Sequence, residues 1–213
     1  MVRQAKIEDL AAVARIHMAS FPGTVTSSLG KLWNGRIVVD YYKEYFNDCP
    51  ELFLVAENDS GEVVGFCMGY KLESGTIDKR LIKHNMFRML IGYCYLLIKG
   101  DKECWRKVKT LIKIKRNEDS NEGKVIIEPS IDGAPDSSKA ELFTIGIFEE
   151  YRGQSYGKDL ILSYFEACKS IGRKLCLISY LNDNLRAERF YYKHGCKPYL
   201  ENGAYNKICY KEL

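Results

Sequence analysis

The sequence predicts an α/β fold, and two patterns carry this prediction. Apolar and polar residues alternate on both sides of the Asn-Asp-Ser-Gly stretch at 58–61, which is typical of a β-hairpin. Residues 139–200 then alternate between strand-like and helix-like patterns. The chain has 213 residues, of which 46% are hydrophobic and 28% charged. This ordinary globular composition suits a single domain over 1–213.

The N-terminal part predicts a short strand, two helices and the hairpin. Pro22 and Gly23 are expected to end the first helix, because proline lacks an amide donor and glycine favours non-helical backbone. Gly35 weakens the second helical pattern without ending it. In order, we expect an edge strand at 2–4, helices from 8 to about 21 and from 27 or 28 to 48, and strands at 51–57 and 62–72.

The rest of the chain predicts a helical insertion followed by an alternation of strands and helices. Residues 117–138 are polar, contain two prolines and predict a loop. We expect helical structure from 78 to about 114, strands at 139–147 and 174–180, helices at 155–171 and 184–194, and final strands near 196–200 and 205–210.

The stretch EEYRGQSYG at 149–157 connects a predicted strand to a predicted helix. The first amides of a helix have no partner within the helix, and its dipole is positive at that end, so a phosphate can bind there. Arg152 and Lys158 would add charge, and Gly153 and Gly157 would allow close approach of the backbone. Glycines are also common at plain strand-to-helix turns, so the stretch alone predicts either structure.

Two segments together resemble a known family. LFTIGIFEEYRGQSYGKDLI, at 142–161, and NDNLRAERFYYKHGC, at 182–196, closely resemble the acetyl-CoA-binding core of the GNAT superfamily of N-acetyltransferases. Asn184, Ala187, Phe190, Tyr191 and Gly195 match the second family pattern in register. In the first segment the family's arginine and last glycine are present at 152 and 157, a serine at 155 replaces the middle glycine, and a cysteine at 196 replaces the final phenylalanine of the second pattern.

The resemblance implies a fold and a cofactor site. The fold would be a mixed, mostly antiparallel, twisted sheet of about seven strands flanked by helices, with a helical insertion between the third and fourth strands. Acetyl-CoA would be the co-substrate, with its pantetheine arm beside one strand and its diphosphate at the following loop. The residues implied in cofactor binding are Ile145, Gly146, Ile147, Arg152, Gly153, Gln154, Ser155, Tyr156, Gly157, Lys158 and Asn184.

The resemblance also implies catalytic roles. Tyr191 would protonate the departing thiolate, because a phenol with a pKa near 10 is a protonated donor at neutral pH. A strand amide at the splay between the fourth and fifth strands would stabilise the tetrahedral oxyanion. Glu141 is the candidate base, although a solvated carboxylate at the start of a strand is an equal alternative. Tyr192 competes with Tyr191 if the helix begins one residue away, and His17 is expected to be packed rather than catalytic.

Other features limit partners and location. Eight cysteines occur singly, several in apolar runs, which favours reduced and mostly buried thiols in a cytoplasmic protein. No metal site is expected, because the three histidines have no ligand-like spacing. The net charge of +4 is too small to predict nucleic acid as a partner. The sequence does not determine the oligomeric state.

The basic insertion, 75–138, lies outside the resemblance. Residues 89–98 are apolar apart from tyrosine hydroxyls, and basic residues flank them. The stretch is shorter than the roughly 20 apolar residues that a membrane-spanning helix needs. It predicts a helix packed on the sheet; the alternatives are a peripheral membrane or lipid-linked substrate contact through 79–116, and a lid over an acidic acceptor.

The function that follows from these observations is transfer of an acetyl group from acetyl-CoA to a primary amine. FPGTVTSSLGKLW, at 21–33, is loosely similar to acetyltransferases encoded with surface-polysaccharide enzymes, which makes an amino sugar the first acceptor to consider. The alternative is a non-catalytic acyl-CoA-binding or regulatory module of the same fold.

Overall fold

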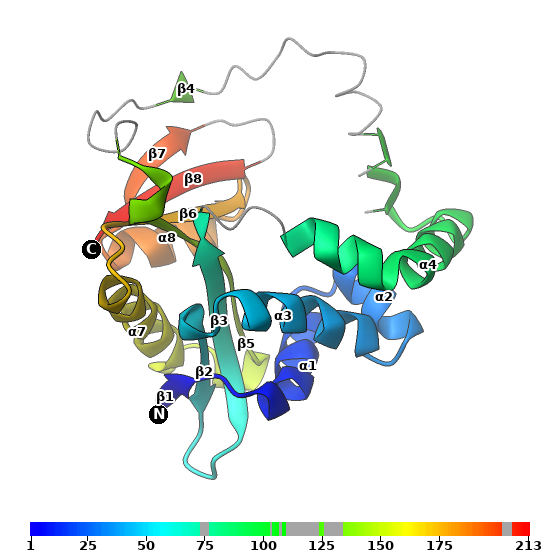
Figure 1. The fold of residues 1–213 in the computed structure, drawn as a ribbon, viewed down its shortest axis with the longest axis horizontal. Helices are drawn as coiled ribbons and strands as arrows, with labels where there is room; N and C mark the ends of the chain where they lie inside the picture. The colour runs from blue at the N-terminus through cyan, green and yellow to red at the C-terminus, as the bar shows by residue number, and fades with distance from the viewer. Residues whose placement is uncertain (73–76, 103, 107, 110–123, 126–133, 202–205) are drawn as a thin grey trace.

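The computed structural model describes residues 1–72, 77–102, 104–106, 108–109, 124–125, 134–201 and 206–213. Their strands form one sheet in the order β1-β2-β3-β5-β6-β8-β7-β4 (Figure 1). β5 and β6 are parallel, and the other neighbours are antiparallel. The strands are β1 Val2–Gln4, β2 Phe53–Glu57, β3 Val63–Lys71, β4 Lys124–Val125, β5 Lys139–Ile147, β6 Leu175–Leu181, β7 Lys197–Glu201 and β8 Asn206–Glu212.

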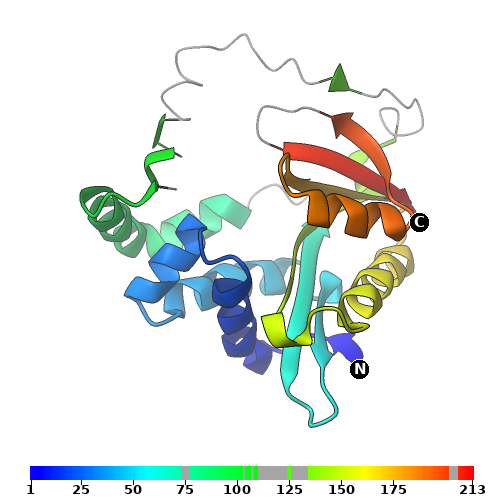
Figure 2. The same ribbon diagram turned by 180° about the vertical axis from the view of Figure 1, so that it is seen from behind.

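Helices cover both faces of this sheet, so the predicted mixed, mostly antiparallel sheet flanked by helices is confirmed (Figures 1 and 2). β4 is an additional two-residue strand in the segment that we expected to be a loop. The helices are α1 Leu10–Ser20, α2 Val25–Leu32, α3 Arg36–Asp48, α4 Ile77–Ile98, α7 Tyr156–Ser170 and α8 Leu185–Lys193, with short 3-10 turns at Ile7–Asp9, Pro50–Leu52, Asp136–Ser138 and Glu149–Tyr151.

The second predicted helix is in fact two helices, α2 and α3. The chain adopts left-handed backbone at Asn34, where φ is 48°, and at Gly35, where φ is 80°. A helix cannot continue through such residues, because their carbonyl and amide groups leave the helical direction. The prediction of one continuous helix was therefore wrong, and the Asn34-Gly35 dipeptide, a common turn sequence, was the signal of the break.

The expected long helix of the insertion is also interrupted. α4 ends at Ile98, and Gly100, with φ 73°, turns the chain out of the helix. Helical backbone resumes in the described residues from 102 to 109. The predicted helical residues 110–114 lie outside the described residues, as does most of the predicted loop at 117–138.

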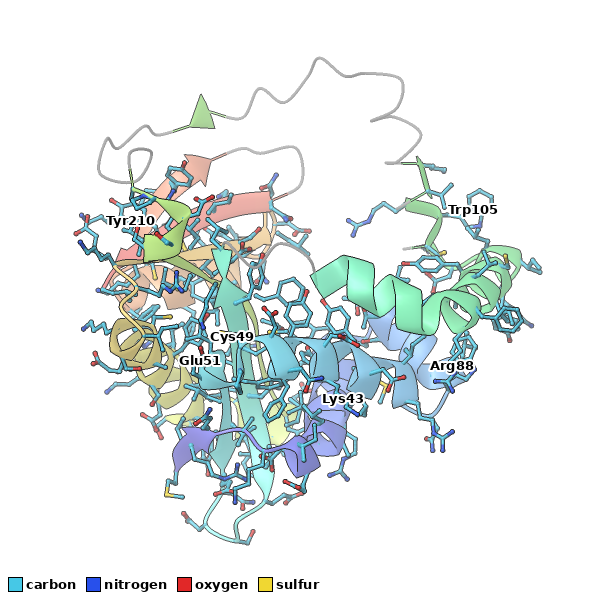
Figure 3. All side chains as sticks on the ribbon, viewed as in Figure 1. Lys43, Cys49, Glu51, Arg88, Trp105 and Tyr210 are labelled. Carbon is cyan, nitrogen blue, oxygen red and sulfur yellow. The ribbon has the colours of Figure 1, made fainter. Side chains whose placement is uncertain are left out.

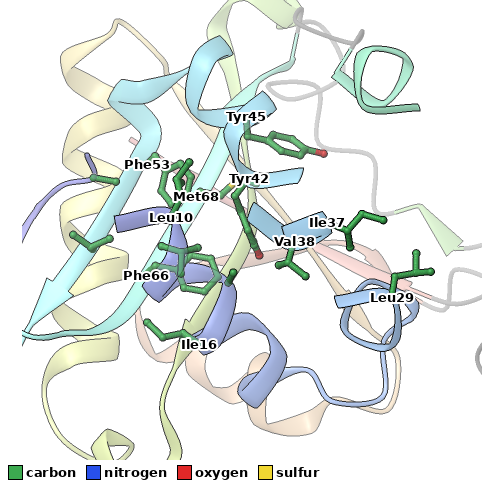
Figure 4. Close-up of a cluster of buried hydrophobic side chains, with 14 of the residues drawn as sticks. Leu10, Ile16, Leu29, Ile37, Val38, Tyr42, Tyr45, Phe53, Phe66 and Met68 are labelled. Carbon is green, nitrogen blue, oxygen red and sulfur yellow. The ribbon is translucent and has the colours of Figure 1, made fainter. Parts of the chain in front are cut away.

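The sheet has a hydrophobic cluster on each face, because successive strand side chains point to opposite sides. On one face Phe53 and Phe66 pack with α1, α2 and α3, and Tyr42 lies in the middle of this cluster (Figure 4). On the other face Leu54 and Leu142 pack with α7 and α8. α4 adds a further layer on α2 and α3, at the edge of the molecule distant from α7 (Figure 1). The expectation that this helix packs on the sheet was wrong.

Candidate active site

The centre of the sheet opens between its two parallel strands. β5 and β6 pair only over Lys139–Leu142 and Leu175–Ile178. Beyond these residues the strands separate, and a cavity of about 840 Å³ lies in the opening. Its wall includes Phe143–Ile147 of β5, Ser179–Leu181 of β6, the residues 152–155, 157 and 158 of the loop and first turn of α7, and the inner side of α8. A cavity of this size can hold a cofactor-sized molecule.

A β-bulge at Phe143 sets the direction of the side chains along β5. Met68 of β3 faces Thr144, whereas the next residue, Gly69, faces Leu142, so Phe143 is an extra residue. The bulge exchanges the two faces beyond it. As a result Ile145 joins Leu142 on the α7 face of the sheet.

The backbone of β5 presents free polar groups to the opening. The amide of Phe148 donates to the carbonyl of Val64, at 3.1 Å, which shows that Phe148 and every second residue before it direct their backbone groups toward β3. Ile145 and Ile147 therefore direct theirs away from β3, where β6 no longer pairs with β5. An extended polar chain could add to β5 here much as a strand would.

The carbonyl of Ile147 is already used to fix the loop. It accepts hydrogen bonds from Arg152 Nε and from Ser20 Oγ, each at 3.1 Å. These bonds join the start of the loop and the end of α1 to the same point of β5. Arg152 is also one of the residues that line the cavity.

The loop and the first turn of α7 form a row of unpaired amides. None of the six amides from Gly153 to Lys158 donates a hydrogen bond within the described part of the chain. Gly153 has φ 86°, a backbone conformation that residues with a side chain rarely adopt. The chain changes direction at this residue and enters the helix. Ser155 is the N-cap, but its side chain makes no capping bond, so its hydroxyl also stays available.

Near this row of amides the cavity wall is closely packed and includes a basic side chain. A Cβ at Gly157 would lie 3.3 Å from Ile147 Cδ1 and 3.5 Å from Phe190 Cε2, so the glycine keeps the first turn of α7 near β5 and α8. Lys158 and Gln154 line the cavity and Gly146 forms part of its floor. Tyr156 does not line the cavity; its side chain packs with Tyr151 and the α7 core.

Asn184 has a structural role as well as a place in the cavity wall. Its Oδ1 accepts a hydrogen bond from the amide of Ala187, at 3.0 Å, and so caps α8. The cap fixes the start of α8 beside the opening. This position of α8 brings Tyr191 to the cavity wall.

Tyr191 is almost fully buried, with 7% of its surface exposed, yet it contributes to the cavity wall. Its ring contacts those of Tyr180 and Phe190. Burial raises the pKa of its phenol above the ordinary value, so the hydroxyl is protonated at neutral pH. The hydroxyl of Tyr192, the competing residue, instead accepts from Tyr180 at 3.4 Å, and Tyr192 is outside the wall.

Glu141 lies on β5 before the bulge and is not part of the cavity wall. Its Oε2 accepts a hydrogen bond from the hydroxyl of Tyr70, at 2.7 Å. Burial raises the pKa of the carboxyl, and the Tyr70 bond opposes part of that increase. The carboxylate is therefore half-buried and oriented, unlike a freely solvated residue at the end of a strand.

Aromatic residues connect Glu141 to the cavity. Phe143, which is 40% exposed, lines the cavity and stacks on Tyr45 with ring centres 5.2 Å apart. Tyr41 and Tyr70 each contact the same Phe143 ring at 6.1 Å. This group could not be predicted from the sequence, because its members come from α3, β3 and the bulge of β5.

His17 and the cysteines take no part in the cavity. His17 is buried, shares a hydrogen bond of 2.7 Å with Tyr42 through Nδ1, and has its pKa lowered to about 4 by burial. This fits the expected packing role. All eight cysteines are free thiols, of which seven are buried and Cys94 is exposed. Among the described residues, no group of three or more His, Cys, Asp or Glu is arranged to hold a metal ion.

A comparison with protein families matches most of this chain to one family. The family model described as the acetyltransferase (GNAT) family covers residues 10–196, which includes β5, the amide row and α8. This chain belongs to the GNAT acetyltransferase family. It is therefore an acetyltransferase, and the alternative of a non-catalytic module loses its main support.

Solved structures are similar to this GNAT chain over its whole length. An acetyltransferase crystal structure has a TM-score of 0.59 at 21% identity, covering 100% of this chain and 99% of that one. PaiA N-acetyltransferase from Thermoplasma acidophilum, in complex with coenzyme A, has 0.59 at 18% identity, with 100% and 98% covered. The structure of YncA from Salmonella typhimurium with its cofactor acetyl-CoA has a TM-score of 0.55 at 14% identity, with 100% and 93% covered. No curated protein matches the sequence.

Proposed function

We propose that this GNAT acetyltransferase transfers an acetyl group from acetyl-CoA to a primary amine. The observation that carries the proposal is the row of six unpaired amides, Gly153 to Lys158, beside the opening between β5 and β6. A helix N-terminus with unpaired amides stabilises phosphate, and an unpaired strand stabilises an amide-containing chain. CoA carries both groups in the same molecule.

The residues at the cavity fit CoA in chemistry and order. The diphosphate would accept hydrogen bonds from the amide row, with Arg152 and Lys158 adding positive charge. The pantetheine amides would pair with the backbone groups of Ile145 and with the amide of Ile147, whose carbonyl already accepts two hydrogen bonds. Asn184 would border the pantetheine, its cap leaving Nδ2 as a donor. The thioester would then lie near Phe143 and Tyr191.

The reaction needs one base and one acid. Glu141 would accept a proton from the acceptor ammonium, through a water if the distance requires it, and the free amine would attack the thioester carbonyl carbon. A β5 backbone amide at the splay would stabilise the oxyanion. The carbon–sulfur bond then breaks, and the thiolate takes its proton from the Tyr191 hydroxyl. The nitrogen of the new acetamide gives up its extra proton, which returns the Tyr191 phenolate to a phenol. The products are the acetamide and free CoA, with no covalent enzyme intermediate.

For the acceptor we propose an amino sugar. The support is the similarity of residues 21–33 to acetyltransferases encoded with surface-polysaccharide enzymes. Phe21 of this segment lines the cavity. The aromatic group around Phe143 offers flat, partly polar surfaces, which suit the apolar face of a sugar ring.

Thiol release from acetyl-CoA tests the proposal directly. Purified protein would be incubated with acetyl-CoA and a panel of amino sugars, sugar nucleotides bearing a free amine, amino acids, polyamines and peptides. We expect release with amino sugars, confirmed by mass spectrometry of the acetamide. Release with another amine class would overturn the acceptor but not the reaction, whereas acetyl-CoA binding without release across the panel would overturn both.

A further inference from the structure

α4 is apolar on two faces, and only one of them is covered. Met89, Tyr93 and Leu97 pack into the cluster made with α1, α2 and α3. Gly92 lets this face approach closely, since a Cβ there would lie 2.5 Å from Leu29 Cδ2. A helix that is apolar on all sides is normally buried on all sides. The second face of α4 therefore calls for an explanation.

That second face carries large exposed apolar side chains at helical spacing. Phe87 is 74% exposed, Leu90 60% and Ile98 85%. We name the group the α4 stripe; it consists of Phe87, Leu90, Ile91, Tyr95, Ile98 and Trp105. Trp105 follows the helix but is held to its end, because its Nε1 donates to the carbonyl of Leu97 at 3.0 Å. A group of large, exposed apolar side chains on one face of a folded domain usually marks an interaction site.

The charges around the stripe have one predominant sign. Within the described residues from 87 to 109, five are basic, namely Arg88, Lys99, Lys102, Arg106 and Lys109, and one is acidic. The acidic residue, Asp101, is half-buried and engaged, since it accepts from the Cys104 amide and from Ser28 Oγ. Lys99 extends over the ring of Tyr95, with Nζ 5.8 Å from its centre. Arg88 forms an ion pair with Asp40 of α3, with Nη1 3.4 Å from Oδ2, but the basic residues still outnumber the acidic ones, so the rim of the stripe is cationic.

We propose that the α4 stripe docks onto the surface of an anionic lipid bilayer. Aromatic and aliphatic side chains with a lysine and arginine rim are the composition of helices that lie in the membrane interface. The apolar groups would enter the acyl boundary, and the basic residues would be attracted to the anionic headgroups. No helix in the described part of the chain is long and apolar enough to cross the membrane, so α4 would lie along the surface.

The charge rim argues against a second copy of the chain as the occupant. A two-fold contact through the stripe would place the cationic rims of both copies against each other. An anionic bilayer complements the same rim. The stripe is also at the extremity of the molecule: Arg88 and Trp105 lie at the opposite end from Tyr210, where a flat surface can reach them (Figure 3).

Vesicle co-sedimentation of the full chain tests the proposal. We expect binding to phosphatidylcholine vesicles that contain phosphatidylglycerol, weaker binding to phosphatidylcholine alone, and a decrease as salt is added, because surface attraction is screened. Leu90→Ser combined with Ile98→Ser should weaken binding at least about tenfold, since two large side chains would lose their burial. The matched control is Leu162→Ser, an exposed leucine on α7 that should leave binding unchanged.

Variants of the basic residues provide a second test in the same vesicle-binding assay. Lys99→Glu with Lys102→Glu should abolish the preference for phosphatidylglycerol, whereas Lys169→Glu with Lys174→Glu, exposed lysines elsewhere, should not. Circular dichroism and sedimentation velocity would accompany every variant. Wild-type protein that stays in the supernatant with all vesicles would overturn the proposal. So would a concentration-dependent dimer that Leu90→Ser and Ile98→Ser abolish, because the stripe would then be a self-contact.

Discussion

The hydroxyl of Tyr70 donates a hydrogen bond of 2.7 Å to Oε2 of Glu141, across the antiparallel pair of β3 and β5. The two residues are direct partners in the sheet, so the bond holds the carboxylate in one orientation beside Phe143. Burial raises the pKa of Glu141, and this bond lowers it in part. Tyr70 thereby lowers the pKa of the carboxyl group that we propose as the base.

The first prediction concerns the pH dependence of turnover. A general base works only when it is deprotonated, so activity should fall as the pH falls through the pKa of Glu141. Tyr70→Phe removes a bond that favours the carboxylate and should move the acidic limb of kcat/KM to higher pH. Tyr95→Phe is the matched control, because Tyr95 is exposed on α4 and does not line the cavity.

Glu141→Gln completes this test. It should lower kcat/KM by about 100-fold and remove the acidic limb, because the base itself is lost. If Glu141→Gln keeps both its rate and its acidic limb, another group is the base.

Tyr191→Phe should lower kcat by about 100-fold while acetyl-CoA affinity stays near the wild-type value, since the hydroxyl would act only as the thiolate leaves. Tyr192→Phe should be close to wild type in both respects, because Tyr192 lies outside the cavity wall. Stopped-flow thiol release and calorimetry measure the two quantities. A large loss of kcat in Tyr192→Phe, together with a near-wild-type kcat in Tyr191→Phe, would identify Tyr192 as the general acid.

Gly157→Trp should weaken acetyl-CoA binding at least about tenfold. Its side chain would lie between Ile147 and Phe190 and fill the space in front of the amide row. Gly157→Ala is the matched variant: its single methyl would lie 3.3 Å from Ile147 Cδ1, the flexible end of a side chain, and should cost much less affinity. Equal affinity of a folded Gly157→Trp protein and the wild type contradicts the proposed diphosphate position.

The free energy of unfolding should fall as the pH is lowered from about 6.5 to about 4 because of His17. Burial lowers its pKa to about 4 in the folded protein, so the unfolded chain binds the proton first. The effect is at most about 3.4 kcal/mol, from 1.36 kcal/mol per pKa unit over the roughly 2.5 units between 6.5 and about 4. Urea unfolding at several pH values measures it, and His17→Asn, which keeps a hydrogen-bonding group near Tyr42, should be less stable at pH 7 but lose less between the two pH values.

Sequence patterns predicted the parts of the site that depend on neighbouring residues. The turn at Gly153 and the first turn of α7 lie within one stretch of sequence. A glycine, a basic residue and the change from a strand-like to a helix-like hydrophobic pattern were therefore enough to predict them. The helix that carries Tyr191 was predicted for the same reason, with its start at the capping residue Asn184. That these residues bind CoA and protonate the thiolate remains a prediction.

Features that depend on distant residues could not be predicted. The bulge at Phe143 is a matter of register between β3 and β5, and a phenylalanine carries no signal for it. The contact between Tyr70 and Glu141 joins residues 71 positions apart. The break at Asn34 had a visible cause in its neighbour Gly35, but helical periodicity on both sides outweighed it. For α4, apolar residues on all sides concealed which face is covered.

Residue-resolved amide hydrogen exchange, with and without acetyl-CoA, tests the central claim most directly. Without ligand, the six amides from Gly153 to Lys158 have no partner in the described structure and should exchange fast. With saturating acetyl-CoA we predict strong protection of these amides and of those of Ile145 and Ile147. The exposed turn at 58–61 should keep the exchange rates that it has without ligand. Binding of acetyl-CoA with unchanged exchange across 153–158 would contradict the account.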